Sequence, residues 1–420
     1  MKHNSSRTVA NRRRRRRIPR CALGGVLGLA LPVLCAQAVR ADTDDSFNVV
    51  AGISAVYDDN LFRLPPGVDP QPFLGESTKA DINTISSVSL RFNKPYSLQR
   101  IELEATAVNS RYQTFDYLNF TAFNYTGAWR WALTPYFHGN LTASRVETPN
   151  SYEQYTGYRI KNLRTTENQR FDGVLELDGV WRLVGGVARS TSTNSEIFVQ
   201  EGDSRIDSAD AAIRYDFLSG SSLSYRYKAG HGEYTNRPVP IPVVLLDNRF
   251  DDVENAILLK WRLTAKTTID ARVGHFQRTS ADFSQRSFGG NVGNLNVNWE
   301  ITSKTGLAAS IAQDLTSYQQ LSSSYIRARR FSLDPYWQMS AKTALRFRYA
   351  FSRSEYLGAI APTPLNGRVD DLSTAMIAFE WQPTRTAVLS ASVQSQKRDS
   401  NLPNFDYHAN MIYLMAQLTF

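Results

Sequence analysis

The sequence predicts an all-β protein: a transmembrane antiparallel up-and-down β-barrel with short periplasmic turns and long extracellular loops. Three observations predict it. The first 41 residues have the composition of an export signal. The remaining chain alternates apolar and polar residues with a period of two, in runs of about ten residues. A tryptophan-containing hairpin pattern occurs four times in the C-terminal part of the chain.

The N-terminal segment predicts a cleaved signal peptide over residues 1–41, followed by a barrel over residues 42–420. A basic run, RRRRRRIPR, precedes an apolar stretch, CALGGVLGLALPVLC, and then the small residues that favour cleavage after Ala38 or Ala41. The alternative is a membrane anchor. The apolar stretch has about 15 residues, however, and a spanning helix needs about 20. The chain's two cysteines, Cys21 and Cys35, both lie in this segment.

The positive charge of the chain is confined to the same segment. It holds ten of the 48 basic residues and no acidic residue, which leaves 38 basic against 39 acidic residues in the remainder. The net charge of +9 therefore gives no reason to expect a nucleic-acid partner.

The alternating runs predict strands with one apolar and one polar face. In residues 253–263, Val253, Ile257, Leu259, Trp261 and Leu263 oppose Glu254, Lys260 and Arg262. Runs of this length suit a tilted membrane-spanning strand. No apolar run after residue 41 approaches the length of a spanning helix, so a membrane-embedded chain would cross with strands.

The connections between runs alternate in length, which gives a strand count. Short connections are expected near residues 94–95, 134–135, 185–186 and 219–220, and after each repeated tryptophan; long polar segments such as 58–80, 146–167 and 354–370 lie between them. Eight hairpins, with an opening run at 47–57 and a closing run at 408–420, give 18 strands. Sixteen is the alternative, because the region near Val187 is poorly patterned.

The repeat consists of KWRLTAKTTIDARV, NWEITSKTGLAASI, YWQMSAKTALRFRY and a shorter EWQPTRTAVLSASV. Indole rings prefer the depth at which lipid tails meet headgroups. We expect a periplasmic aromatic girdle made of Trp131, Trp181, Trp261, Trp299, Trp337 and Trp381. A soluble propeller would also repeat a tryptophan, but these spacings drift from 38 to 44 residues and one strand face is charged. The terminal Phe420 of the closing strand is expected to act as an assembly signal.

The polar faces predict the lining of the lumen, because a charge facing lipid costs about 2–4 kcal/mol at the membrane midplane. The candidates are Arg91, Arg130, Arg182, Arg214, Arg226, Lys228, Lys260, Arg262, Arg272, Arg346 and Arg348. Two interpretations remain open. The wall is salt-bridged with no substrate, or basic pairs such as Arg226/Lys228 and Arg346/Arg348 track an anionic polymer. The loop at 233–250 is expected to fold inward as a constriction.

The sequence gives no indication of an enzyme or of a cofactor. No G-x-S-x-G motif occurs, and His138, His231, His275 and His408 are isolated and lack metal-ligand spacing. The segment Asp58-Asp59-Asn60 offers oxygen ligands for calcium, although an Asx turn is the preferred interpretation.

Two segments resemble a known family. GISAVYDDNLFRLP and SLQRIELEATAVNSRYQTFDYLNFTAFNYTGAWRWAL are similar to the exosortase/PEP-CTERM-associated exopolysaccharide outer-membrane proteins (EpsL type), a β-barrel porin family. The most specific parts are Tyr57 to Phe62 and the pair Gln99-Arg100. The resemblance implies a role in exopolysaccharide biosynthesis or export, with no catalytic residues to carry over. The strand count is also that of the alginate-export barrel, as an architectural analogy.

We therefore expect a protein of the bacterial outer membrane that forms an aqueous passage for a secreted polysaccharide. Its partners would be outer-membrane lipid, the barrel assembly machinery, the polysaccharide, and periplasmic and inner-membrane export components. The alternatives are a general small-solute porin and a closed barrel that acts as a scaffold or adhesion protein.

Overall fold

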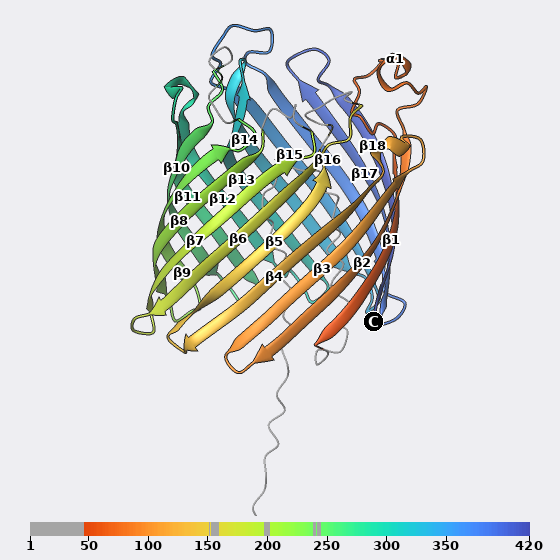
Figure 1. Cartoon of the computed structure of the whole chain (residues 1–420). Helices are drawn as coiled ribbons and strands as arrows, with labels where there is room; N and C mark the ends of the chain where they lie inside the picture. The colour runs from red at the N-terminus through yellow and green to blue at the C-terminus, as the bar shows by residue number, and fades with distance from the viewer. Residues whose placement is uncertain (1–45, 151, 153–158, 197–201, 238–240, 242–244) are drawn as a thin grey trace, which may run out of the picture.

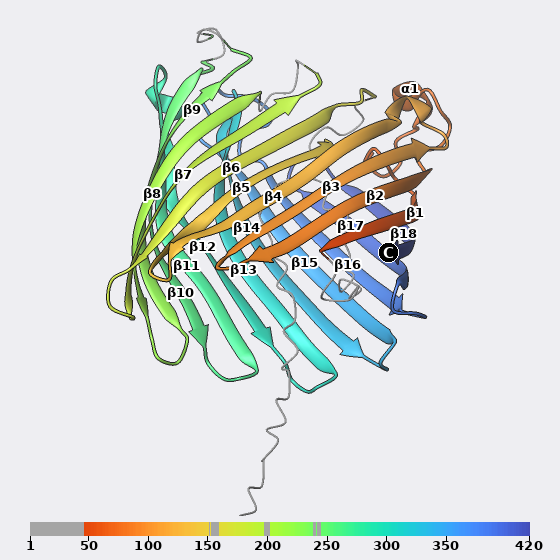
Figure 2. The same cartoon turned by 60° about the horizontal axis from the view of Figure 1, so that its bottom comes forward.

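The chain folds into one closed β-barrel, shown in a computed structural model that describes residues 46–150, 152, 159–196, 202–237, 241 and 245–420 (Figure 1). Eighteen strands pair antiparallel with their neighbours in chain order, and β1 pairs with both β2 and β18 to close the ring. Figure 2, viewed partly from below, shows the first and last strands side by side. The count of 18 is confirmed and that of 16 is wrong.

The strands have similar lengths, which keeps the wall even in height. They are β1 Phe47–Asp58, β2 Asp81–Tyr96, β3 Gln99–Tyr112, β4 Phe120–Thr134, β5 Phe137–Pro149, β6 Leu163–Glu176, β7 Trp181–Asn194, β8 Ser204–Asp216, β9 Ser222–Tyr234, β10 Arg249–Arg262, β11 Thr267–Ser280, β12 Phe288–Trp299, β13 Thr305–Gln320, β14 Ser323–Gln338, β15 Thr343–Leu357, β16 Val369–Trp381, β17 Ala387–Ser400 and β18 Tyr407–Thr419. The helical segments among the described residues are α1 Gln71–Leu74, η1 Asp116–Leu118 and η3 Ser284–Arg286. No helix in the described ranges has the length and apolarity needed to cross a membrane.

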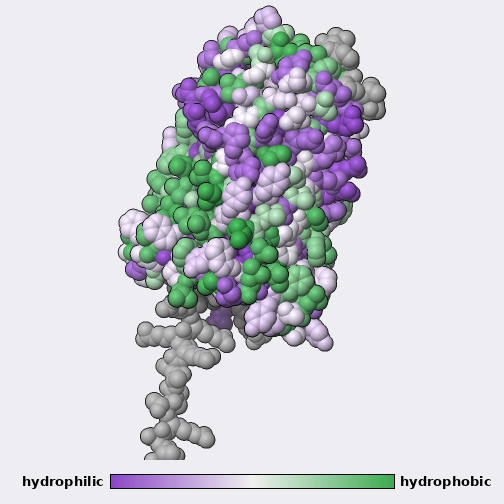
Figure 3. All heavy atoms as spheres, turned by 90° about the vertical axis from the view of Figure 1, so that its left-hand side faces the viewer, coloured by the Kyte–Doolittle hydropathy of each residue, from purple (hydrophilic) through white to green (hydrophobic). Residues whose placement is uncertain are grey.

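The predicted two-sided strands are present. On β10, Ile257 and Trp261 point outward and are exposed, and Glu254 on the other face is ion-paired with arginines of β9 and β11. In Figure 3 the outer surface over this side of the barrel is largely hydrophobic in its lower part and hydrophilic in its upper part. Outward apolar residues with an inward polar face are the arrangement that lipid outside and water inside require.

The two ends of the barrel differ as the connection lengths predict. The short turns gather at the lower end in Figure 1, together with the C-terminus, and the longer connections gather at the upper end. We take the lower end as periplasmic. Phe420 lies there, where its backbone N–H donates to the Val49 carbonyl at 2.8 Å across the β1–β18 seam. The proposed signal segment, residues 1–41, lies outside the described residues.

The expected turn at residues 185–186 is wrong. Gly185 and Gly186 lie inside β7, and the chain reverses between Glu176 and Trp181 instead. The Asp178 carboxylate accepts hydrogen bonds from the backbone N–H groups of Val180 and Trp181, and Gly179 has a φ of 75°. An Asp-Gly pair is a strong hairpin signal. Consequently Trp181 begins a rising strand, and Asp178 belongs to the turn.

The first extracellular loop has a small core of its own. Phe62, Leu64 and Leu74 pack with Phe115 and Leu118 of the connection between β3 and β4. The Phe62 and Phe115 rings meet edge to face, with their centroids 4.8 Å apart. Loop segments that bury apolar side chains in this way hold a fixed position above the barrel wall.

One outward position on the wall is packed differently from the rest. Trp131 is buried, because its ring stacks on Phe171 and meets Phe137 edge to face. The paired residue Gly139 leaves the room for this, since a Cβ there would lie 2.6 Å from the Trp131 ring and 2.0 Å from the Asp172 carbonyl oxygen. By contrast, the nearest atom to a Cβ at Gly185 would be 3.6 Å away.

We predict that Gly139→Ala destabilises the barrel and that Gly185→Ala does not. The added methyl at position 139 would displace the indole or the strand backbone, at a cost of about 1–3 kcal/mol. Urea unfolding of both variants in lipid vesicles measures the difference. Equal unfolding midpoints for the two variants would show that the glycine does not make room for the indole.

Candidate functional site: the barrel lumen

The predicted lumen residues share one face of the sheet. Arg91, Arg130, Arg182, Arg214, Arg226, Lys228, Lys260, Arg262, Arg272, Arg346 and Arg348 all alternate with outward apolar or aromatic residues of their strands. They differ in whether a carboxylate neutralises them, and this decides what the wall offers to a solute.

One ion-pair network crosses the wall from β3 to β8. Arg130 on β4 donates to the Glu102 carboxylate of β3 at 2.8 Å and to the Asn140 side chain of β5 at 3.1 Å. Asn140 in turn donates to Asp172 at 2.9 Å. Arg170 lies between Asp172 at 3.5 Å and Asp210 of β8 at 2.5 Å. Arg91 makes a separate pair with Glu104 at 3.0 Å.

A second network continues from β9 to β14. The Glu254 carboxylate of β10 accepts from Arg226 of β9 at 2.8 Å and from Arg272 of β11 at 2.9 Å. Arg272 also approaches Asp314 of β13 at 3.4 Å, and Asp314 pairs with Arg330 of β14. The charges are therefore bound laterally, from strand to strand around the wall.

The basic pairs that suggested an anionic polymer are mostly neutralised. Arg226 is held by Glu254, Arg346 contacts Glu380 at 2.7 Å, and Arg348 pairs with Asp334. Lys228 differs, because it makes no ion pair with any described residue. Its two register neighbours, Asp210 and Glu254, are both bound to arginines. The structure thus favours the salt-bridged wall over a basic track.

A third group lies toward the periplasmic end of β5 to β8. Glu176 contacts Arg182 at 3.2 Å and His138 at 3.3 Å. Asp216 pairs with Arg182 and lies 3.1 Å from Arg214. At the ends of the strands, Arg262 lies over Gly220 of the adjacent turn, and Lys260 faces Asp270 in the register without an ion pair.

Sequence reasoning missed the arginines that hold the extracellular mouth. Arg286 of η3 is almost fully buried and donates to the backbone carbonyl oxygens of Leu245 and Gln320, at 2.9 and 2.6 Å. Burial lowers the pKa of its guanidinium to about 10. Three loops thus meet at the guanidinium of Arg286. The basic residues of the loops have no regular spacing, so the sequence held no signal that could have identified Arg286.

A buried carboxylate ties two of the same loops. Asp247 accepts from the backbone N–H groups of Asp282 at 2.8 Å and Phe283 at 3.1 Å, and burial raises its pKa. Arg237 is also buried and bonds the Gln319 side chain at 2.5 Å. The predicted inward loop, 233–250, is therefore anchored to neighbouring loops at both flanks. Its residues 238–240 and 242–244, where a constriction would be sought, lie outside the described residues.

Asp58 and Asp59 bind protein groups. The Asp58 carboxylate accepts from the backbone N–H of Asn60 at 2.9 Å, which is the preferred Asx turn, and it pairs with buried Arg63 at 2.8 Å. Asp59 accepts from Asn410 of β18 at 2.7 Å. In the part of the chain that the structure describes, no cluster of three or more Asp, Glu or His residues suits a metal ion.

Charges also occur on the outer face, near the extracellular rim. Arg327 and Arg329 point outward and share Glu355, at 2.6 and 3.9 Å, and Arg330 points into the lumen.

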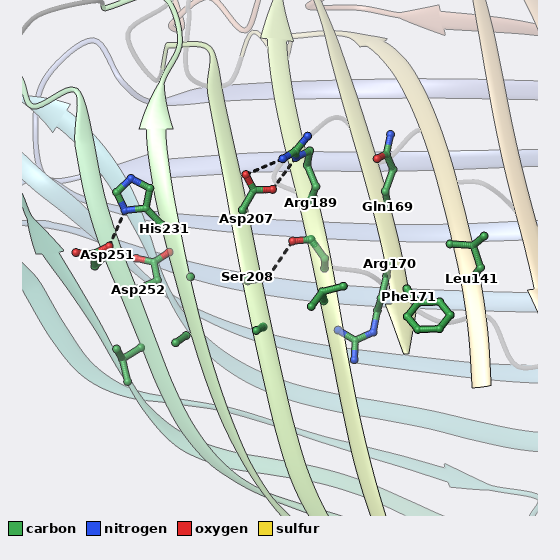
Figure 4. Close-up of a pocket in the computed structure, with 16 residues that line it drawn as sticks. Leu141, Gln169, Arg170, Phe171, Arg189, Asp207, Ser208, His231, Asp251 and Asp252 are labelled. Atoms are coloured by element: carbon green, nitrogen blue, oxygen red, sulfur yellow. Dashed lines mark hydrogen bonds and ion pairs between the residues drawn. The ribbon is translucent and has the colours of Figure 1, made fainter. Parts of the chain in front are cut away.

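A shallow hollow of about 760 Å³ lies on the outer wall over β5 to β10. Figure 4 shows Arg189–Asp207 and His231–Asp251 bridging neighbouring strands along its upper side. The hollow is lined by outward residues such as Phe171 and Val187, and also by Arg170 of the lumen network.

The predicted girdle tryptophans lie at the periplasmic ends of their strands. Trp181, Trp261, Trp299, Trp337 and Trp381 are exposed on the outer face. Trp131 departs from the expectation because it is buried, and Trp129, two residues earlier on the same face, is exposed instead. The Trp129 indole N–H donates to Gln99 at 2.8 Å. The alternation fixed the face of both residues, and only the packing of Phe137 and Phe171 decides which of them is covered.

We predict that Arg286→Met loosens the extracellular loops and leaves the wall intact. The bound carbonyl groups would lose a charged donor, which costs about 1–3 kcal/mol. Hydrogen–deuterium exchange should rise at residues 281–287 and 318–324 and stay unchanged in β2 to β6. Lys397→Gln, at an exposed position on β17, is the control. Unaltered loop exchange in Arg286→Met would contradict the role of this residue as a tie.

Part of the chain matches a family of β-barrel porins. Residues 259–420, less than half of the chain, match a family described as "Putative beta-barrel porin 2". A search of curated proteins finds no match.

Solved structures share the fold. Pseudomonas aeruginosa OpdK, solved with vanillate, has a TM-score of 0.51 at 10% identity, covering 89% of this chain and 99% of its own. A BenF-like porin from Pseudomonas fluorescens has a TM-score of 0.51 at 8% identity, covering 90% and 99%. Pseudomonas aeruginosa OpdQ has 0.51 at 11% identity, covering 90% and 100%. At these identities the likeness establishes the fold. With its apolar outer face and its polar lumen, the chain is a porin-like β-barrel of the bacterial outer membrane.

Proposed function

We propose that this protein is an outer-membrane channel for small polar solutes. The observation that carries the proposal is the lumen wall, whose charged side chains are bound to one another from strand to strand. A wall of neutralised charges stays hydrated and does not hold a polyanion tightly. Barrels of 16 to 18 strands are wide enough to enclose an aqueous channel.

The comparisons support the same proposal. The matched family and one of the similar structures are described as porins, and another similar structure was solved with vanillate, a small molecule. The single uncompensated lysine among the predicted basic pairs, Lys228, adds a local positive charge to the wall. We therefore infer a channel with a mild preference for anions.

Passage of a secreted polysaccharide is the second candidate. It is favoured by the resemblance of residues 52–65 and 97–133 to the exosortase-associated outer-membrane proteins. Much of the first segment closes the extracellular end: Asn60 bonds the Leu64 and His408 carbonyl oxygens, and Arg63 contacts Gln396 of β17. These contacts hold the loop to the wall and give no indication of a glycan site.

The experiment that tests the proposal is conductance of the purified full-length mature protein in planar bilayers. A small-solute channel should give steady single-channel current steps in KCl. Uptake of small solutes by proteoliposomes should be either saturable or linear in solute concentration, at a rate that depends on the size of the solute. A closed scaffold would carry no steady current, and that result would overturn the proposal. Loss of polysaccharide secretion on gene deletion, without a conductance, would favour the second candidate.

We predict that Lys228→Gln lowers the anion-to-cation permeability ratio by about twofold. A unit charge roughly 8 Å from a permeating ion in water changes the ion's energy by about 0.5 kcal/mol, with opposite signs for an anion and a cation. Screening at about 0.15 M salt reduces each change roughly threefold, which leaves about a twofold change in the ratio. The reversal potential across a KCl gradient measures the ratio. The matched control is Lys397→Gln, which removes the same charge from the outer face of β17. An equal reversal potential for wild type and Lys228→Gln would remove Lys228 from the ion path.

A further inference from the structure

The periplasmic turns of the C-terminal half carry a basic residue at nearly the same place. Lys266, Lys304 and Lys342 each follow a repeated tryptophan by five residues, and Arg385 follows the fourth tryptophan by four. All four basic residues are exposed. Among the turn segments 263–266, 300–304, 338–342 and 382–386, Glu300 is the single acidic residue. The row therefore carries a net positive charge along four consecutive hairpins.

The turns are held together by other residues. In the β12–β13 turn the Thr302 hydroxyl accepts from the backbone N–H groups of Lys304 at 3.1 Å and Thr305 at 2.9 Å. In the β14–β15 turn Ser340 does the same for Lys342 and Thr343, both at 3.1 Å. The lysine side chains take no part in these bonds, so turn geometry does not explain why lysine recurs there.

The lysine side chains are largely free. Neither Lys266 nor Lys304 makes an ion pair or side-chain hydrogen bond with any described residue. Lys342 uses one of its three ammonium donors on the Pro383 carbonyl oxygen at 2.8 Å. The ammonium groups of this exposed row can therefore interact with an anionic molecule outside the chain.

The pairing between hairpins fixes the depth of the row. The carbonyl oxygens of Lys266, Lys304 and Lys342 accept from the backbone N–H groups of Glu300, Gln338 and Gln382. Each of these donors directly follows the tryptophan of the next hairpin, and Trp299, Trp337 and Trp381 all point outward. Because indole rings mark the boundary between lipid tails and headgroups, the lysines lie at headgroup depth. Successive lysines are two strands, or roughly 10 Å, apart.

We propose that this basic row, Lys266, Lys304, Lys342 and Arg385, binds anionic phospholipid headgroups of the inner leaflet of the outer membrane. Of the turns in the N-terminal half, the β2–β3 turn carries the exposed Lys94, whereas residues 133–136, 177–180 and 217–221 contain no basic residue. The barrel therefore attracts anionic lipid along one side of its periplasmic rim. Long lysine side chains can reach phosphate groups from such positions, and the attraction weakens with salt.

The test measures lipid selectivity of the full-length mature barrel in phosphatidylcholine bilayers. Spin-labelled phosphatidylglycerol and phosphatidylcholine report the ratio of their association constants at the barrel surface. The wild-type ratio should exceed one and fall as salt is raised. The triple variant Lys266→Gln/Lys304→Gln/Lys342→Gln should lose most of this preference. For the lipids in contact with the row, each lost lysine should lower the ratio of association constants by about fivefold or less.

The matched control is Lys79→Gln/Lys161→Gln/Lys397→Gln, which removes three positive charges from the extracellular end. Its selectivity should equal that of the wild type. Circular dichroism establishes that all variants are folded. The proposal is overturned by a wild-type ratio of one, by an unchanged ratio in the turn variant, or by an equal loss in the control. It is also overturned if the turn variant loses binding to isolated peptidoglycan and keeps its lipid selectivity.

Discussion

Closure of the sheet between β1 and β18 is the constraint on which the rest of the structure depends. Inside a bilayer no water is present to bond a free strand edge, so every backbone N–H and C=O must find a partner in the wall. The register from Val50↔Thr419 to Asp58↔Met411 supplies these partners at the seam. Phe420 is drawn into it, since the Phe420 and Val49 backbone groups bond each other in both directions. Asp59 then fastens the first loop to Asn410 above the same seam.

Closure also decides where charge can lie. Once one face meets lipid, charged side chains of the spanning segment must face inward, where they are crowded against those of the neighbouring strands. Lateral carboxylate–guanidinium contacts neutralise these crowded charges, and Glu254 between Arg226 and Arg272 is the clearest case. Single pairs of this kind, largely buried in the wall, contribute little net stability because the loss of hydration offsets the attraction. Their effect is to set the field inside the lumen, which the uncompensated Lys228 then biases.

Much of the fold could be predicted from the sequence because a period of two leaves little freedom. The strand number, the facing of Arg226 and Trp261, and the position of the short turns after the repeated tryptophans all follow from alternation and turn residues. The turn at Asp178-Gly179 was misplaced because Gly185-Gly186 offered a competing local signal, and only pairing with β6 and β8 shows that those glycines are inside a strand. Which carboxylate meets which arginine depends on the stagger between strands, and one sequence does not specify this. The burial of Arg286 depends on three loops that meet only after closure.

The interlocked hairpins make the wall modular. From β10 to β17 each unit consists of a falling strand, a fixed turn and a rising strand, and it contacts the next unit through the same backbone bond beside a tryptophan. The family match begins at residue 259, on the first of these units. Because a unit enters and leaves at the extracellular end, inserting or deleting one preserves the side on which the chain ends. It would change the circumference by about one ninth. Duplication of the sequence segment that encodes one hairpin can therefore give a barrel with a pore of a different diameter.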